Sequence, residues 1–204
     1  GLVAFEWRSW EHLDFADDVI CPLEWRATWT YGNALSSASN GDFVVSFRST
    51  SVVGIVDRVS GDFTWKWGPG RVSHQHHPTY LPNGHVLMFD NGVHGRGAPR
   101  SRVIEVDPRD ENRIAWQYAG NPPVSFFSPL VGSADRLPNG NTLICEGMTG
   151  RLFEVTMDSE VVWEYVNPFF GEHPRHGYVN SLFRARRYAP DFRGLAGRTL
   201  TAEA

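Results

Sequence analysis

Cysteine is scarce in this chain, because Cys21 and Cys145 are the only two among 204 residues. No Cys-x-x-Cys pattern occurs, so the sequence lacks a thiolate zinc motif. Two interpretations of the thiols stay open: a disulfide in an oxidising compartment, or two separate buried side chains.

An excess of positive charge is also missing. Nineteen Lys and Arg stand against 23 Asp and Glu, for a net charge of -4, which argues against a nucleic-acid partner. No segment approaches the roughly 20 apolar residues of a membrane-spanning helix, and no signal peptide is visible at the N-terminus. The P-loop, Gly-x-Ser-x-Gly and dinucleotide-binding motifs are absent as well.

Aromatic and turn-forming residues are abundant instead: Trp 8, Phe 13, Gly 20 and Pro 13. These residue types favour short strands joined by tight turns. Hydrophobic residues at 41% and charged residues at 21% are typical of a globular chain, which excludes general disorder. The length suits a single core.

An internal repeat is the strongest signal in the sequence. Three Asn-Gly pairs, which favour tight turns, each precede a β-rich run, and a second β-rich run follows. The pairs and their two runs are Asn40-Gly41 with 43–48 and 53–57, Asn83-Gly84 with 85–89 and 103–107, and Asn139-Gly140 with 142–145 and 152–156.

Each unit then closes on two aromatic residues at positions i and i+2, which share one face of a strand. The aromatic pairs are Trp65/Trp67, Trp116/Tyr118 and Trp163/Tyr165. They recur about every 50 residues, and a period of this size with several strands per unit is typical of propeller blades. The sequence therefore predicts an all-β fold of the β-propeller type, with an irregular β-sandwich as the alternative.

The two ends of the chain resemble pieces of further blades. Phe5-Glu6-Trp7 resembles the closing strand at 163–165, and 179–185 resembles an opening strand in which Arg184 corresponds to Arg48. We expect three complete blades plus two partial ones, over a domain of residues 1–190 that is truncated at its N-terminus. Residues 191–204 are expected to form a C-terminal tail. Such a unit is either a four-bladed ring or part of a larger ring, closed by further sequence or by a homo-oligomer.

Three polar segments beside the opening strands are candidates for a site near the propeller axis: 29–35, 73–78 and 89–97. Arg96 lies among glycines, where a backbone can approach a ligand closely, and its guanidinium suits a sulfate or phosphate group. A neighbouring histidine supplies a proton carrier or nucleophile. An alternative is a metal site on His74, His76 and His77, completed by His94, His12 or Asp90.

These motifs together resemble the bacterial arylsulfotransferases, or aryl-sulfate sulfotransferases, over roughly residues 3–190. The resemblance rests on Trp29-x-x-x-Asn33, Val45-Ser46-Phe47-Arg48, Gln75-His76, Phe89-Asp90-Asn91-Gly92 with Arg96, and Leu137-Pro138-Asn139-Gly140-Asn141. It implies a six-bladed propeller that moves a sulfuryl group from a phenolic sulfate ester to another phenol through a sulfohistidine. It implies no cofactor, no metal, and a periplasmic or secreted location.

The resemblance also assigns residues to roles. The implied catalytic residues are His76, Arg96 and Tyr31, and the implied substrate-binding residues are Asn33, Gln75, His77, Asn91 and Arg48. Two positions depart from the family: Tyr31 replaces the histidine of a Trp-x-His-x-Asn motif, and Arg151 is nearest to the family's nucleophilic histidine. His173 and His176 do not match that motif.

Two other functions stay open beside sulfuryl transfer. One is a non-catalytic propeller that binds a ligand or a protein. The other is a metal-dependent hydrolase or lyase built on the three clustered histidines.

Overall fold

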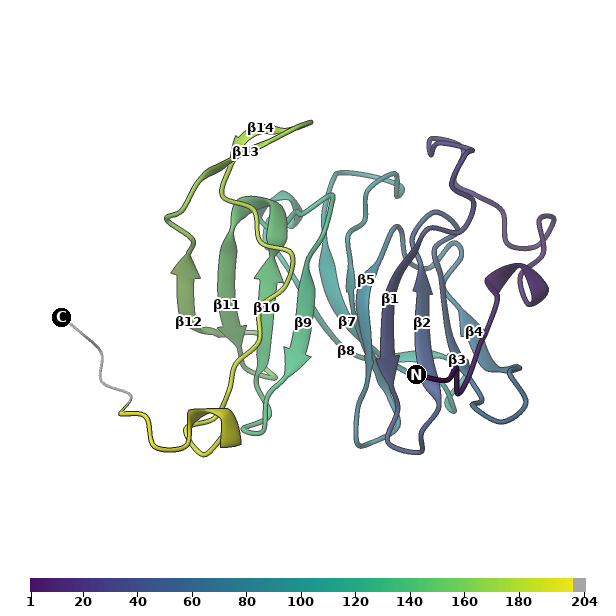
Figure 1. The fold of residues 1–204 in the computed structure, drawn as a ribbon. Helices are drawn as coiled ribbons and strands as arrows, with labels where there is room; N and C mark the ends of the chain where they lie inside the picture. The colour runs from purple at the N-terminus through teal and green to yellow at the C-terminus, as the bar shows by residue number, and fades with distance from the viewer. Residues whose placement is uncertain (200–204) are drawn as a thin grey trace.

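The structure, a computed structural model, describes residues 1–199 and is all-β, as predicted. Three four-stranded antiparallel sheets follow one another along the chain (Figure 1). Sheet A contains β1 (Gly32–Ser37), β2 (Phe43–Phe47), β3 (Val52–Val56) and β4 (Phe63–Trp67). Sheet B contains β5 (His76–Tyr80), β6 (Val86–Asp90), β7 (Arg102–Asp107) and β8 (Arg113–Ala119). Sheet C contains β9 (Ser133–Arg136), β10 (Thr142–Glu146), β11 (Arg151–Val155) and β12 (Val161–Val166).

The remaining elements are small. A two-stranded hairpin follows sheet C, and four 3₁₀ turns complete the described chain. The hairpin pairs β13 (Gly171–His173) with β14 (Gly177–Val179), and the turns are η1 (Ser9–Glu11), η2 (Pro123–Ser125), η3 (Gly147–Thr149) and η4 (Arg193–Leu195). None of these helical segments in residues 1–199 has the length or apolar character needed to cross a membrane.

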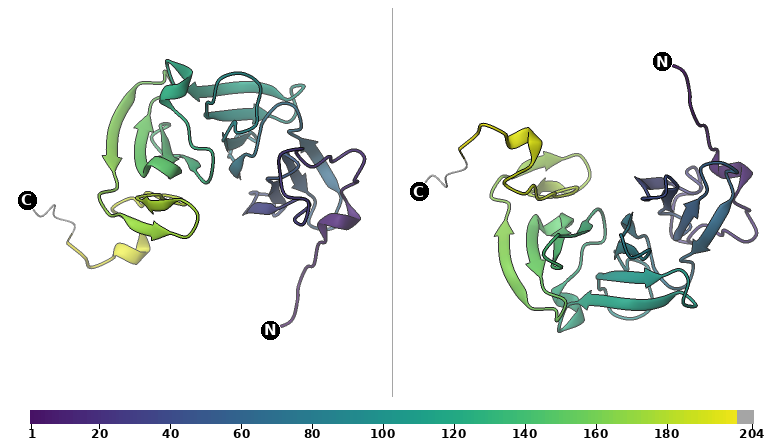
Figure 2. Two further views of the ribbon diagram at one scale, coloured as in Figure 1. Left: turned by 90° about the horizontal axis from the view of Figure 1, so that it is seen from above. Right: turned by 90° about the horizontal axis from the view of Figure 1, so that it is seen from below.

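The three sheets are arranged along an arc, with their strands in the order of the sequence (Figure 2). Neighbouring sheets approach each other through their first strands. Ser36 of β1 donates a hydrogen bond to the carbonyl oxygen of Pro78 on β5, over 2.9 Å. The described residues form a propeller-like arrangement that does not close into a ring, so the number of blades in a closed ring stays a prediction.

The predicted turns and strands lie where the sequence placed them, with boundaries shifted by a residue or so. The Asn-Gly pairs connect the first two strands of each sheet, and Gly41, Gly84 and Gly140 take φ values near +90° that favour glycine. The aromatic pairs lie on β4, β8 and β12. Sheet B differs from the other two sheets by an insertion, residues 93–100, between β6 and β7.

The first strand of each sheet was not predicted from the sequence. The β-rich run after each Asn-Gly pair is the second strand, and β1, β5 and β9 precede it. These three strands carry polar residues such as the His76-His77 pair, so their patterns lack the apolar character that identifies a strand. Most of the candidate site residues lie on these strands or beside them.

The cores lie between the sheets. One cluster joins Val53 of sheet A to Met88 and Ile104 of sheet B, and a second joins Phe89 of sheet B to Phe153 of sheet C. Sheet B therefore buries one face against sheet A and the other against sheet C, which removes apolar surface from water at about 25 cal/mol per Å². The aromatic pair of sheet B is buried.

The corresponding pair of sheet C has a different environment. Trp163 and Tyr165 are each 40% exposed, because no further sheet covers their face among residues 1–199. Their rings stack on one another at 6.4 Å between centroids.

The strands predicted at the two ends are largely absent from the described residues, although the two-stranded sheet β13–β14 follows sheet C, so the number of partial blades stays a prediction. Phe5-Glu6-Trp7 forms no strand; the Phe5 ring stacks on Phe43 at 5.2 Å and the Trp7 indole donates to the Gly61 carbonyl at 2.8 Å. Of the predicted strand 179–185, only Val179 lies in a strand. Apolar packing against an existing sheet satisfies these residues without a further blade. The predicted tail begins with η4 at 193–195, and its residues 200–204 lie outside the described chain.

Candidate functional site

The segment between β4 and β5 brings the histidine-rich motif to the junction of sheets A and B. Gln75 is fully buried, and its amide nitrogen donates to Ser46 Oγ at 2.9 Å and to the Val52 carbonyl at 3.1 Å. Asn33 Nδ2 donates to the Gln75 carbonyl at 2.7 Å. These bonds fasten the start of β5 to sheet A, so Gln75 and Asn33 both hold the motif in place.

The orientation of His76 is fixed by two acceptors. Its Nδ1 lies 2.7 Å from Asn91 Oδ1 and 3.1 Å from the carbonyl oxygen of His74. Asn91 is itself fully buried, and its Nδ2 donates to the carbonyls of Ser128 at 2.7 Å and Val131 at 2.8 Å. Because Asn91 Nδ2 is committed to two carbonyls, Oδ1 must face His76, and Nδ1 of His76 therefore carries the proton.

Arg48, at the end of β2, is a buried cation with one carboxylate partner. Its guanidinium pairs with Glu24 at 2.8 Å and lies over the Tyr31 ring at 5.8 Å from the centroid. Burial lowers the pKa of His76, and the positive charges of Arg48 and Arg184 lower it further. Arg48 and Arg184 thus lie close enough to act electrostatically on the same imidazole.

Two arginines also affect the pKa of His77, and one of them, Arg184, affects His76 as well. Burial lowers the pKa of His77 to about 4, and the charges of Arg184 and Arg186 add to the effect. Its side chain is 4% exposed, and its φ of +51° lies in the left-handed region. His74 is likewise buried with φ +59°, and its pKa falls to about 4, chiefly through burial and then through Arg48. Backbone strain of this kind clusters at functional sites.

Several of these side chains carry buried polar atoms without a hydrogen-bond partner in residues 1–199. They include Asn33 Oδ1, Gln75 Oε1, His74 Nδ1 and His77 Nδ1. Buried polar atoms are normally paired, so four unpaired ones on two adjacent segments form an unusual concentration. Three of the four belong to residues predicted to bind substrate.

A cavity of about 580 Å³ lies between the loops of sheets A and B. Four arginines line it, together with the two histidines His74 and His94 and the thiol of Cys21. The arginines are Arg71, Arg96, Arg100 and Arg102. Arg102 pairs with Asp90 at 2.8 Å, whereas no carboxylate of the described chain pairs with the other three.

The structure separates His76 and Arg96, which were expected to line one ligand-binding site. Arg96 lines the cavity between the loops, and His76 does not. His76 lies instead beside Asn91, and the positive charges of Arg48 and Arg184 act on its imidazole. The three clustered histidines also differ in their neighbours, since only His74 faces other metal-binding side chains, namely Cys21 and His94.

The sequence analysis missed three groups that the structure brings to this region. Glu24 and Cys21 come from an irregular N-terminal turn that no periodic pattern marks. Arg184 corresponds to Arg48 in sequence, and that likeness was the available signal for it. The thiols of Cys21 and Cys145 are both free, Cys145 being buried, so no disulfide links them.

The fold and the site together define a class: a propeller-like all-β protein with buried histidines and a buried arginine near the junction of two neighbouring sheets. The sequence identifies the family within that class. Residues 26–168 match the Arylsulfotransferase (ASST) family, and the chain belongs to that family. No curated protein sequence matches the chain significantly.

Solved structures show the same fold at low sequence identity. A streptogramin B lyase matches with a TM-score of 0.51 and 14% identity, over 69% of this chain and 42% of its own. A protein of unknown function from Bacteroides caccae matches with a TM-score of 0.50 and 14% identity, over 66% and 45%. A catalytically inactive virginiamycin B lyase from Staphylococcus aureus with quinupristin matches at 0.50 and 12%, over 69% and 42%. The chain spans less than half the length of these proteins.

Proposed function

We propose that this protein transfers a sulfuryl group from a phenolic sulfate ester to a phenol, with His76 as the nucleophile. The observation that carries the proposal is the fixed tautomer of His76. Its Nδ1 donates toward Asn91 and the His74 carbonyl, which leaves the lone pair on Nε2. No hydrogen bond within residues 1–199 engages that Nε2.

A neutral imidazole held in this way suits covalent catalysis. Nε2 attacks the sulfur of the aryl sulfate, the N–S bond forms, and the bond from sulfur to the aryl oxygen breaks to release a phenolate. The phenolate takes the proton of the acceptor phenol. The acceptor oxygen then attacks sulfur, the N–S bond breaks, and the imidazole returns to its starting state.

The arginines beside His76 supply the charge that this reaction needs. Sulfuryl transfer places negative charge on the sulfuryl and aryl oxygens, and guanidinium groups stabilise such oxyanions. Arg48 and Arg184 both act on the His76 imidazole, and within residues 1–199 Glu24 is the one carboxylate partner of Arg48. The unpaired buried atoms of Asn33, Gln75 and His77 support the prediction that these residues contact substrate.

Two of the predicted site residues, Asn91 and Tyr31, take different roles in this proposal. Asn91 positions His76 instead of binding substrate, since all its polar atoms are engaged. Tyr31 is 51% exposed beside Arg48, where its ring can pack against an aromatic substrate. Arg96 remains the predicted oxyanion clamp, and its position in a separate cavity makes Arg184 the competing assignment.

The test is turnover of 4-nitrophenyl sulfate with a phenol acceptor. We expect His76→Gln to lower kcat/KM by about 10³-fold or more, and His173→Gln, in the exposed hairpin, to leave it unchanged. An acid-labile sulfate adduct on the peptide that contains His76 identifies the nucleophile. Turnover by His76→Gln at the wild-type rate overturns the assignment of His76 as the nucleophile.

The arginine assignments are tested in the same assay. If Arg184 holds the sulfuryl oxygens, Arg184→Gln lowers kcat/KM more strongly than Arg96→Gln does. The reverse order supports the original prediction for Arg96.

A non-catalytic ligand-binding function is the second candidate, because the position nearest the family's nucleophile holds an ion-paired arginine. Arg151 pairs with Glu164 at 2.7 Å and with Glu146 at 3.5 Å. Calorimetric binding of 4-nitrophenyl sulfate without turnover by the wild-type protein favours this candidate.

A further inference from the structure

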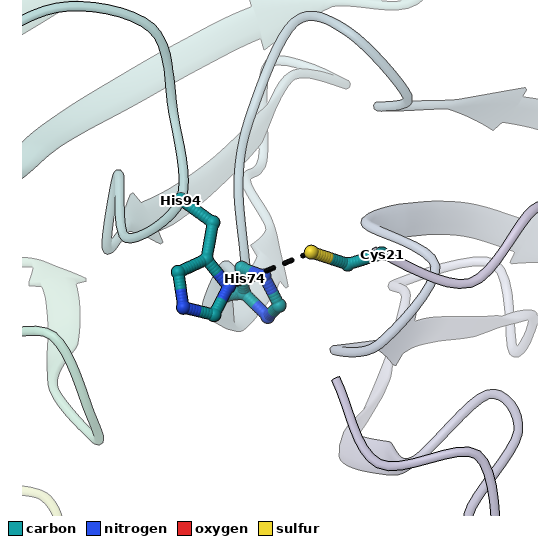
Figure 3. Close-up of side chains that lie close together, drawn as sticks. All are labelled: Cys21, His74 and His94. Atoms are coloured by element: carbon teal, nitrogen blue, oxygen red, sulfur yellow. Dashed lines mark hydrogen bonds between the residues drawn. The ribbon is translucent and has the colours of Figure 1, made fainter. Parts of the chain in front are cut away.

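A second cluster of reactive side chains lies outside the proposed sulfuryl-transfer site. Cys21, His74 and His94 each present a potential ligand atom, and these three atoms lie within 4.8 Å of one another (Figure 3). They come from three separate segments: the N-terminal turn, the β4–β5 loop and the β6–β7 insertion. All three line the cavity between the loops of sheets A and B.

Two of the three distances between these ligand atoms match one metal geometry. Cys21 Sγ lies 3.5 Å from His94 Nδ1, and His94 Nδ1 lies 3.2 Å from His74 Nε2. Tetrahedral zinc, with bonds of about 2.3 Å to sulfur and 2.0–2.1 Å to nitrogen, places sulfur and nitrogen about 3.5 Å apart and two nitrogens about 3.3 Å apart. We propose that Cys21, His74 and His94 form a zinc site with its fourth position open to the cavity.

Hydrogen bonding alone does not satisfy this cluster. His94 Nδ1 faces both the thiol and His74 Nε2, at 3.5 Å and 3.2 Å. The two contacts share one proton or one lone pair on this nitrogen, so hydrogen bonding stabilises each of them less than a separate partner would. A divalent cation satisfies both contacts at once, as it takes the thiolate and both nitrogen lone pairs.

The other nitrogen of His74 has the surroundings expected of a metal ligand. His74 Nδ1 is buried without a hydrogen-bond partner in the described chain, and Glu24 Oε1 lies 3.6 Å from it. A histidine that binds metal through one nitrogen normally directs its other N–H at a carboxylate or carbonyl. With Nε2 on zinc, the proton sits on Nδ1 and Glu24 is its acceptor after a small approach.

The chain builds this arrangement locally. The turn that begins at Cys21 closes through a hydrogen bond of 3.0 Å from Glu24 N to the Cys21 carbonyl, so thiol and carboxylate are set together. Cys21 N in turn donates to the Ser49 carbonyl at 2.8 Å, which ties the turn to sheet A. One thiolate and two neutral imidazoles favour zinc over calcium or magnesium, which prefer oxygen ligands.

Exposure indicates an open coordination position. His74 is fully buried, whereas the His94 side chain is 29% exposed and Cys21 is half-buried. Three protein ligands with a solvent-facing fourth position are typical of zinc that binds water or an anion. The neighbouring guanidinium of Arg96 in the same cavity favours an anion at that position.

Metal-stripped protein titrated with Co²⁺ and Zn²⁺ tests the proposal. We expect one metal ion per chain, a thiolate-to-cobalt charge-transfer band in the near ultraviolet, and loss of that band on addition of Zn²⁺. Zinc is also expected to protect Cys21 from alkylation, while buried Cys145 stays unreactive with or without metal. Absence of stoichiometric binding, or a cobalt spectrum without the thiolate band, overturns the proposal.

Variants at the two partly exposed ligands avoid the buried His74. Cys21→Ala is expected to abolish the charge-transfer band, and His94→Gln to weaken zinc binding by more than the roughly 10–100-fold that loss of an outer-shell partner costs. The matched control His173→Gln lies in the exposed hairpin and keeps wild-type affinity. Loss of zinc in the control, or retention in both ligand variants, contradicts the site.

A thermal melt of each variant confirms that the chain is folded. The Cys21 and His94 side chains take no part in the proposed sulfuryl transfer, so variants at these two residues test the zinc site without removing a group that this reaction uses.

Discussion

Replacement of Asn91 by alanine removes the amide that links β5, β6 and the loop before β9. The wild-type side chain is fully buried and makes three close hydrogen bonds. They join its Oδ1 to His76 Nδ1 at 2.7 Å and its Nδ2 to the carbonyls of Ser128 at 2.7 Å and Val131 at 2.8 Å. Alanine leaves these groups in place without their partner.

The loss of stability depends on which of these groups keep another hydrogen-bond partner. His76 Nδ1 retains the His74 carbonyl at 3.1 Å, and the Ser128 carbonyl retains a long contact of 3.4 Å from Ser101 Oγ. The Val131 carbonyl retains none among the described residues. Since a buried unsatisfied group costs about 1–3 kcal/mol, we expect Asn91→Ala to lower the free energy of unfolding by about 2–5 kcal/mol. For a chain of this length that corresponds to a fall in Tm of roughly 5–15 °C.

Urea denaturation followed by tryptophan fluorescence measures the change, with a thermal melt as the second readout. Asn139→Ala is the matched control, because Asn139 is exposed and the Glu154 oxygen that it contacts at 3.0 Å keeps a second donor, Asn141 Nδ2, at 2.7 Å. We expect the control to lose about 1 kcal/mol or less. Equal losses in the two variants refute the view that burial makes the Asn91 bonds costly to remove.

Three further changes test separate features. The pKa of His77 is lowered to about 4 from 6.5, so the unfolded chain binds more protons between these values, and stability falls as the pH drops through this window. His77→Asn, which suits the left-handed backbone, is expected to reduce that fall by roughly 1.4 kcal/mol per pH unit in urea melts across the window. Glu24→Gln leaves the buried Arg48 without its carboxylate and is expected to cost about 1–3 kcal/mol in urea, whereas Glu11→Gln, from the exposed pair with Arg8, costs less than about 1 kcal/mol. Gly92→Ala places a Cβ 1.9 Å from the Arg100 carbonyl oxygen at φ +67°, so its Tm is expected to fall further than that of Gly70→Ala, which has a similar φ and open space around it.

Each of these predictions has a contrary outcome. An acid stability profile that His77→Asn leaves as steep as in the wild type shows that another group governs it. Equal losses for the two glutamate variants show that the Arg48 pair is screened like a surface pair. Equal Tm values for the two glycine variants show that the loop around Gly92 moves aside at little cost.

Much of the fold was predictable because local chemistry decides it. Asn-Gly pairs set the turns, and apolar runs such as Phe43–Phe47 and Val86–Asp90 form the second strands whatever the distant contacts. The first strands were missed, because His76–Tyr80 forms a strand through its neighbours and shows no periodic apolar pattern. Phe5–Trp7 has the aromatic pattern of a strand but forms none, because its rings pack on sheet A instead.

The candidate site, like the fold, was predictable only in part. Residue identities indicated histidine with arginine, and the structure does gather His76 with Arg48. The partner of each imidazole was not predictable, since Asn91, Glu24 and Cys21 reach the histidines across long stretches of chain. Sequence similarity to the family singled out Arg96, whereas the geometry places it with His94 and Cys21.

The sequence by itself determined that this is an all-β chain of short strands and Asn-Gly turns, and that it belongs to the arylsulfotransferase family, because turn conformation and strand patterning depend on neighbouring residues. Only the tertiary structure decided which nitrogen of His76 carries its proton and which side chains share a cavity. Hydrogen bonds and electrostatic effects act over a few ångströms in space, and folding sets those distances without regard to separation along the chain.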